Sequence, residues 1–114
     1  GNYVFNACAK LKSVNLSGGG ELTEIGNSAF LGCASLGSID LSPCVKLTKI
    51  GNSAFDGCKN ARVKLPKSIT EIANGAFGSS YGHYCQRVLV PSVAIKQLVI
   101  QSGYDWNLIE MYQP

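Results

Sequence analysis

LTEIGNSAF, at residues 22–30, returns 25 residues later as LTKIGNSAF (47–55) and again, with more changes, as ITEIANGAF (69–77). The phenylalanines keep the same rhythm, because Phe5, Phe30 and Phe55 recur every 25 residues and Phe77 follows 22 residues later. Self-similarity at this spacing is typical of stacked units, each of which buries its apolar face against its neighbours. The sequence therefore predicts a repeat protein, which favours a binding surface over an active site.

Each unit also contains a short stretch with the alternation of a half-buried strand. The four stretches end in Val14-x-Leu16, Ile39-x-Leu41, Val63-Lys64-Leu65 and Val88-Leu89-Val90. We expect these strands to lie side by side as a parallel ladder, with one or two helical turns per repeat on the outer side.

Three asparagines mark the start of the expected helical turns. Asn27, Asn52 and Asn74 each precede a short run containing Ala and Phe. At such a position an Asn side chain can accept hydrogen bonds from the free backbone N–H groups that open a helical turn. We interpret these asparagines as caps.

The two ends of the chain differ. Ser92 is placed to cap a helix with an apolar stripe of Ala94, Ile95, Leu98 and Val99, and Gly103 is placed to end it. We expect this helix to cover the last repeat and Trp106, with Leu108 and Ile109, to complete the lid by packing into the core. At the other end Gly1 begins within a unit, so we expect further repeats or another cap before it. Self-association through the uncapped N-terminal edge is a second expectation.

Composition limits the classes of function. The 114 residues are 46% hydrophobic and 15% charged, which indicates one globular domain. The net charge is +3, and the lysines and arginines are scattered along the sequence with acidic residues between them, unlike the basic stripe of a nucleic-acid-binding protein. No run of 18 apolar residues is present, so we expect no membrane insertion by this segment.

The five cysteines suggest packing more than chemistry. Cys8, Cys33 and Cys58 follow their phenylalanines by three residues, so we expect them to stack as a buried, reduced ladder; the aligned position in the last unit is Ser80. Cysteines one repeat apart lie along the stack and do not converge on one point as metal ligands do. We therefore expect no metal and no cofactor. Cys44 and Cys85 are the only two cysteines whose positions allow exposure, and a disulfide between them stays open as an alternative.

One other pair of residues invites a catalytic interpretation. His83, the single histidine, lies two residues before Cys85, and a Cys/His nucleophile can be imagined there. The stretch is irregular and has no orienting acid nearby. We therefore predict that the chain is not an enzyme and keep this pair as a rival hypothesis.

The repeat resembles the BspA-like, or Treponema-type, leucine-rich repeat, whose unit has the form LxxIxLPxxLTxIxxxAFxxCxxL. The match lies at Leu36 to Leu41, Leu47 to Ile50, Ala54-Phe55 and Cys58. The resemblance implies an α/β repeat: a leucine-rich repeat solenoid with a short parallel strand ladder and a helical C-terminal cap. Residues 1–90 would be repeats, the first incomplete, and 91–114 the capping segment. It also implies a bacterial protein that is secreted or on the cell surface and serves in adhesion.

The strand ladder supplies the candidate binding site. With Ile39, Val63 and Val88 pointing inward, the intervening residues must point outward. The candidate ligand-binding residues are Ser38, Asp40, Arg62, Lys64, Arg87 and Leu89, with Ser13, Asn15, Ser17 and Ser42 on the same face. Rows of Arg and Lys can pair with carboxylate or sulfate groups, so we expect a protein or glycan partner on a host or bacterial surface. The alternatives are a solvated sheet face and a spacer or assembly module without its own ligand.

Overall fold

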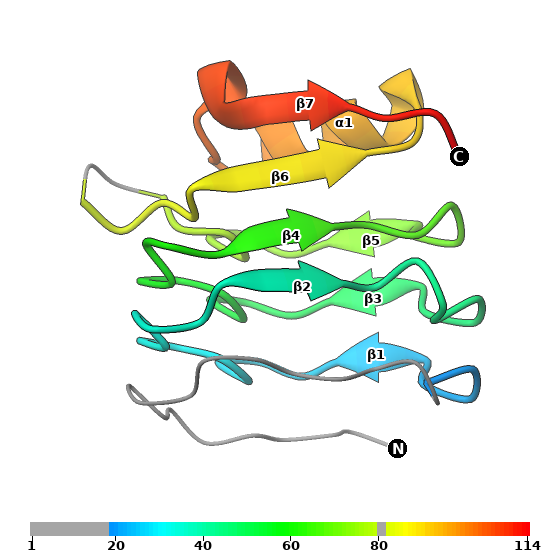
Figure 1. The fold of residues 1–114 in the computed structure, drawn as a ribbon, viewed down its shortest axis with the longest axis horizontal. Helices are drawn as coiled ribbons and strands as arrows, with labels where there is room; N and C mark the ends of the chain where they lie inside the picture. The colour runs from blue at the N-terminus through cyan, green and yellow to red at the C-terminus, as the bar shows by residue number, and fades with distance from the viewer. Residues whose placement is uncertain (1–18, 80–81) are drawn as a thin grey trace.

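The computed structural model describes residues 19–79 and 82–114, which form two parallel sheets lying one behind the other (Figure 1). The front sheet, in the order β2-β4-β6-β7, consists of β2 (Ser38–Asp40), β4 (Arg62–Lys64), β6 (Arg87–Val90) and β7 (Ile109–Met111). The back sheet, in the order β1-β3-β5, consists of β1 (Glu24–Ile25), β3 (Lys49–Ile50) and β5 (Glu71–Ile72). Between β6 and β7 the chain forms α1 (Val93–Gln101) and the 3-10 turn η1 (Trp106–Leu108). These elements fit the expected α/β repeat.

The front sheet confirms the predicted strand ladder over the described residues. Neighbouring strands pair in parallel with Ile39 opposite Val63 and Val63 opposite Val88. All three of these side chains are buried, as the alternation predicted. The expected strand ending at Leu16 lies outside the described residues.

The back sheet was not predicted. Its strands are only two residues long, too short for an alternating pattern to be read from the sequence. The repeated LTxI motif forms them: Ile25 pairs with Ile50, and the N–H of Gly51 donates to the carbonyl of Ile25 over 2.8 Å. The motif therefore stacks on its own copies as a second ladder.

The helical turns expected after this motif are absent from the described repeats, where the chain forms hydrogen-bonded turns instead. Ser28 has φ 58° and the equivalent Ser53 has φ 55°, a left-handed conformation that interrupts a right-handed helix. The backbone bonds across repeats, since the N–H of Phe30 donates to the carbonyl of Ala54 over 2.7 Å. The prediction was wrong because the aligned copies satisfy one another's backbone groups.

Asn27 shows the same principle. Its side-chain oxygen Oδ1 accepts from the backbone N–H of Asn52 over 2.9 Å, so it links two repeats and does not cap a helix of its own. The Asn27 side chain does accept from a backbone N–H, as predicted, but that N–H belongs to the next repeat and not to a helical turn that follows Asn27.

The buried core, most of which is aliphatic, contains a stack of aromatic rings. Phe30 and Phe55 stack with ring centroids 5.1 Å apart, Phe55 and Phe77 with centroids 5.6 Å apart, and both pairs lie 9° from parallel. Tyr104 meets Phe77 edge-on at 6.0 Å. The predicted repeat register is thus confirmed by the rings, apart from Phe5, which lies outside the described residues.

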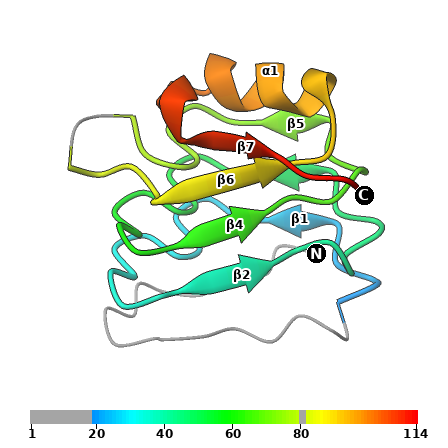
Figure 2. The same ribbon diagram turned by 45° about the horizontal axis from the view of Figure 1, so that its top comes forward.

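The C-terminal segment differs in part from its prediction. Ser92 caps α1 by accepting from the N–H of Ile95, and Ile95 and Val99 are buried as expected, whereas Ala94 is exposed. Trp106 is 64% exposed, so the prediction that it packs into the core was wrong. The neighbouring residues instead form β7, an unpredicted strand that continues the front sheet in parallel beside β6 (Figure 2). Because β7 takes the apolar side chain of Ile109 toward the core, Trp106 is left outside it.

Candidate functional site

The outer face of the front sheet carries the candidate residues. We call it the ladder face and define it by its outward side chains: Ser38, Asp40, Arg62, Lys64, Arg87, Leu89 and Glu110. No described element lies over this face in Figure 1, and α1 packs behind β6 and next to β5. The only arginines of the chain, Arg62 and Arg87, both belong to it.

One row of the ladder face consists of Ser38, Arg62 and Arg87, which lie opposite one another on neighbouring strands. The like charges of the two arginines are relieved by acceptors on the C-terminal segment. Arg87 Nη1 donates to the carbonyl of Asn107 over 3.2 Å, and Arg62 Nη2 lies 3.9 Å from Glu110 Oε2. The carboxylate and the guanidinium of this ion pair are both about half exposed, so it contributes only about 0–1 kcal/mol.

The next row consists of Asp40, Lys64, Leu89 and Glu110. Asp40 Oδ1 accepts from the backbone N–H of Ser42 over 2.9 Å. Hydrogen bonding by the Ser42 side chain, together with this N–H and the nearby Lys64 ammonium, holds the pKa of Asp40 below its usual value. The structure thus brings all six predicted residues onto one surface and adds Glu110, which the sequence did not predict because β7 was not foreseen.

The ladder face differs in charge from the back sheet. In the back sheet Glu24, Lys49 and Glu71 alternate across the strands, and Lys49 Nζ lies 3.6 Å from Glu71 Oε2. The ladder face instead carries three cations and two acids, with two of the cations on adjacent strands of one row. It is therefore a mixed polar surface with a small positive excess, less basic than the three cations Arg62, Lys64 and Arg87 suggested in the sequence.

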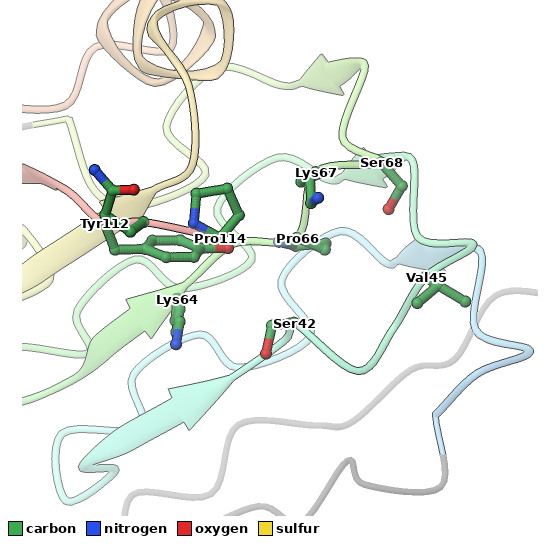
Figure 3. Close-up of a pocket in the computed structure, with 9 residues that line it drawn as sticks. Ser42, Val45, Lys64, Pro66, Lys67, Ser68, Tyr112 and Pro114 are labelled. Atoms are coloured by element: carbon green, nitrogen blue, oxygen red, sulfur yellow. The ribbon is translucent and has the colours of Figure 1, made fainter.

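A pocket of about 510 Å³ opens where the ladder face ends, beyond the C-terminal ends of β2, β4 and β7 (Figure 3). Its lining comes from three segments: Ser42 and Val45; Lys64, Pro66, Lys67 and Ser68; and Tyr112, Gln113 and Pro114. Lys64 Nζ lies 4.6 Å from the centre of the Tyr112 ring, a cation–π contact. Sequence reasoning missed this pocket because its walls lie far apart in the chain. Of the candidate ligand-binding residues predicted from the sequence, only Lys64 lines this pocket.

The described cysteine ladder contains the predicted Cys33 and Cys58 and adds Cys85, which was not predicted to belong to it, while Cys8 lies outside the described residues. Cys33, Cys58 and Cys85 are fully buried, and the thiols of Cys58 and Cys85 donate to the carbonyls of Phe30 and Phe55 over 2.9 and 3.3 Å. Burial raises the pKa of the Cys58 thiol to about 12 and that of Cys85 well above its usual value. Although its position in the sequence allowed exposure, Cys85 takes the rung next to Cys58, and its backbone N–H donates to the carbonyl of Phe77 over 3.0 Å.

Cys44, whose position also allowed exposure, is fully buried and belongs to the core, in the turn after β2. Both Cys44 and Cys85 are free thiols, so the disulfide alternative was wrong. His83 and Cys85 are not brought together as a catalytic pair. His83 Nδ1 lies 3.7 Å from Asp56 Oδ1, whereas the buried Cys85 thiol donates a hydrogen bond to the backbone carbonyl of Phe55. Among the described residues no group of three or more His, Cys, Asp or Glu side chains is placed to hold a metal ion.

Within residues 19–79 and 82–114, no helix has the length and apolar character needed to cross a membrane. Comparison with known proteins extends the repeat pattern over most of the chain. A family model described as BspA type leucine rich repeat region (6 copies) matches residues 1–93. Searches of curated proteins and of solved structures each gave no match. With its repeats matched over residues 1–93 and its phenylalanines stacked in the same register, this chain belongs to the BspA-type leucine-rich repeat family.

Proposed function

We propose that this chain is a non-enzymatic binding module of a secreted or cell-surface bacterial protein, and that it recognises a protein or glycan through the ladder face. The observation that carries the proposal is the pair of outward rows on the front sheet, held in parallel register and left uncovered by the other described elements. The family membership agrees with an interaction module at a surface.

The geometry of the ladder face suits an extended partner. Neighbouring strands repeat every ~4.8 Å, so Ser38, Arg62 and Arg87 present polar groups at a regular spacing. Arginine donates two parallel hydrogen bonds to a carboxylate or sulfate, and extended repeat surfaces are a common site of recognition. A partner carboxylate would have to displace Glu110 from Arg62, an exchange that costs little because the ion pair is exposed.

The architecture we propose is a solenoid whose C-terminal end is closed by α1 and β7. In support, α1 packs next to β5 at the end of the back sheet, and β7 pairs with β6 at the end of the front sheet. In this architecture the partner surface is the continuous front of the stack.

The second candidate function is a structural spacer or assembly module. It is favoured by one observation: each ladder-face cation already has a neighbour within the chain, since Arg62 meets Glu110, Arg87 meets the Asn107 carbonyl, and Lys64 meets Tyr112. A surface that satisfies its own charges needs no ligand to do so.

Binding to an array of extracellular-matrix proteins, host glycans and bacterial polysaccharides separates the two candidates. The test variant is Arg62→Glu/Lys64→Glu/Arg87→Glu, which reverses the charge of the ladder face. The matched control is Lys46→Glu/Lys49→Glu/Lys59→Glu, which changes the net charge equally but lies off that face. Circular dichroism must show that both variants are folded.

A partner that binds the wild type and the control but not the ladder-face variant supports recognition by this face. If both variants lose the partner equally, binding depends on net charge and not on the ladder face. If both variants retain the partner, the binding site lies on another surface. An array without any partner would favour the spacer.

A further inference from the structure

Both arginines of the ladder face lean toward the C-terminal segment. Arg87 Nη1 donates to the carbonyl of Asn107 over 3.2 Å, and Arg62 Nη2 lies 3.9 Å from Glu110 Oε2. Because Arg62 belongs to β4 and Glu110 to β7, the Arg62 side chain reaches across β6, the strand that carries Arg87. Both guanidinium groups therefore lie over the part of the face that β6 and β7 form.

These two groups keep most of their hydrogen-bonding capacity. A guanidinium has five N–H donors. Within the described part of the chain, Arg87 uses one donor, and the 3.9 Å approach of Arg62 to Glu110 is too long for a hydrogen bond. Since the two arginines lie opposite each other on neighbouring strands, about 4.8 Å apart, one carboxylate can meet both.

An apolar side chain lies beside this pair. Of the seven side chains that define the ladder face, only Leu89 is apolar, and it is half-buried. Leu89 follows Arg87 by two residues on β6, so the two side chains share a face and lie about 6.6–6.8 Å apart. On β7 the residue opposite Leu89 is Glu110. The face thus holds a cationic group and an apolar group at a fixed spacing.

The acids of the ladder face disfavour a polyanion. Asp40 and Glu110 lie at the two ends of the row that contains Leu89, and Asp40 is held there by the backbone N–H of Ser42. A chain with charges along its whole length would bring some of them against these carboxylates, whereas a ligand with one carboxylate avoids them. The charges and the apolar side chain together fit a peptide better than a sulfated glycan.

We propose that the ladder face binds an extended peptide with an acidic residue and, two positions away, an apolar residue. The carboxylate lies on Arg62 and Arg87, and the apolar side chain lies on Leu89. An extended peptide has the same two-residue spacing as β6, so both side chains reach their partners at once. Glu110 competes with the ligand for Arg62. The inference rests on the proposed function and narrows its partner to an acidic peptide segment.

The test is a titration of the 114-residue protein with three capped peptides, followed by ¹H–¹⁵N NMR. The probe, acetyl-GLTDTLG-amide, carries Leu two positions from Asp in both directions. The shifted peptide, acetyl-GTLDLTG-amide, has the same composition but places Leu next to Asp, on the opposite face of an extended chain. The neutral peptide, acetyl-GLTNTLG-amide, lacks the charge.

We expect the probe to shift the amide signals of residues 62–64, 87–89 and 108–110, with a Kd of about 1 mM or tighter. The shifted and neutral peptides should bind at least about fivefold more weakly, because each loses one of the two contacts. Equal binding of the probe and the shifted peptide, or no shifts on the ladder face at about 5 mM probe, would overturn the proposal.

Two variants assign the contacts. Arg87→Gln should weaken the probe about tenfold and leave the neutral peptide unchanged, and Leu89→Ser should weaken the probe about fivefold. Lys49→Gln, on the back sheet, removes the same charge as Arg87→Gln and should leave probe affinity within about twofold. Equal losses in Arg87→Gln and Lys49→Gln would reduce the effect to net charge and overturn the proposal.

A third variant should improve binding. Glu110→Gln removes the carboxylate that faces Arg62, so we expect probe binding to tighten about two- to fivefold. Glu24→Gln, on the back sheet, removes the same charge away from the face and is the matched control. A side chain that serves folding alone gives no such gain, and a gain in Glu110→Gln no larger than in Glu24→Gln would contradict the competition.

Failure of this inference can be told from failure of the proposed function by titrating a heparin-derived tetrasaccharide in the same way. Ladder-face shifts with the tetrasaccharide that Arg87→Gln abolishes, without shifts from the probe, would retain the face as a recognition surface and reject the peptide. If neither ligand shifts the face and the array partner binds Arg62→Glu/Lys64→Glu/Arg87→Glu as well as the wild type, both the inference and the proposed function fail.

Discussion

Phe55→Ala removes the middle ring of the aromatic stack. Phe55 has no exposed surface and stacks on Phe30 at 5.1 Å and on Phe77 at 5.6 Å. Truncating a buried Phe costs about 3–5 kcal/mol, and stacked aromatic pairs contribute about 0.5–1.5 kcal/mol each beyond their burial. We expect the upper end of the 3–5 kcal/mol range, because both faces of the ring lose a partner. That is a large share of the roughly 5–15 kcal/mol of a small domain.

Urea unfolding followed by circular dichroism measures this loss, and thermal unfolding should show a midpoint lower by about 12–20 °C. Trp106→Ala is the control, since it also truncates a large aromatic side chain but one that is 64% exposed. Its cost should be no more than about a third of the Phe55 loss. If Trp106→Ala destabilises the protein as much as Phe55→Ala does, the stack is not what joins the repeats.

Three further substitutions or conditions test the stacking of the repeats. Asn27→Ala should cost about 1 kcal/mol in urea unfolding because the N–H of Asn52 loses its acceptor, whereas Asn27→Asp keeps an acceptor and should cost less; equal costs would contradict this role. Gly51→Ala should destabilise by about 1–3 kcal/mol, because an added Cβ would lie 2.5 Å from Asn27 Oδ1, while Gly20→Ala, with nothing within 4 Å, should be near neutral by the same assay. Since the pKa of Cys58 is raised from 9.0 to about 12 in the folded protein, unfolding releases a thiol that ionises more readily. Stability should therefore be full below pH 9 and decline between pH 9 and 12, and mass spectrometry should find Cys58 alkylated by iodoacetamide in urea but not in buffer at pH 8. Rapid alkylation of the folded protein would refute its burial.

The sequence was most informative where the same side chain recurs at the same place in successive repeats. Phe30, Phe55 and Phe77 align in the sequence and stack in space, so their packing could be predicted from spacing alone. The alternation around Ile39 and Val63 likewise located the front sheet and its outward face. In both cases one repeat sets the environment of the next.

Prediction failed where hydrogen bonds between repeats replace those within a segment. The left-handed Ser28 and Ser53 are followed by turns whose N–H groups bond to the next copy, a pattern that resembles a capped helix when one copy is considered alone. The two-residue strands β1 and β3 are too short to show a period. Their existence depends on the neighbouring repeat.

The site was only partly predictable because the last segment folds back onto it. Residues Ile109–Met111 extend the front sheet and bring Glu110 to Arg62, and the chain beyond them carries Tyr112 to Lys64. Both side-chain contacts join residues 48 positions apart, without any repeat to align them. Cys85 follows Phe77 by eight residues, whereas Cys33 and Cys58 follow their phenylalanines by three, and this longer spacing hid its place on the cysteine ladder.

Arginine footprinting tests most directly whether the ladder face is the recognition surface. Arg62 and Arg87 are the only arginines and both lie on that face, so phenylglyoxal modification followed by mass spectrometry reports on it without substitutions. With the array partner bound, we expect modification of both arginines to slow by at least about fivefold, a threshold that corresponds to roughly 1 kcal/mol, while acetylation of Lys49 on the back sheet is unchanged. Unchanged modification of both arginines in the saturated complex would contradict the account.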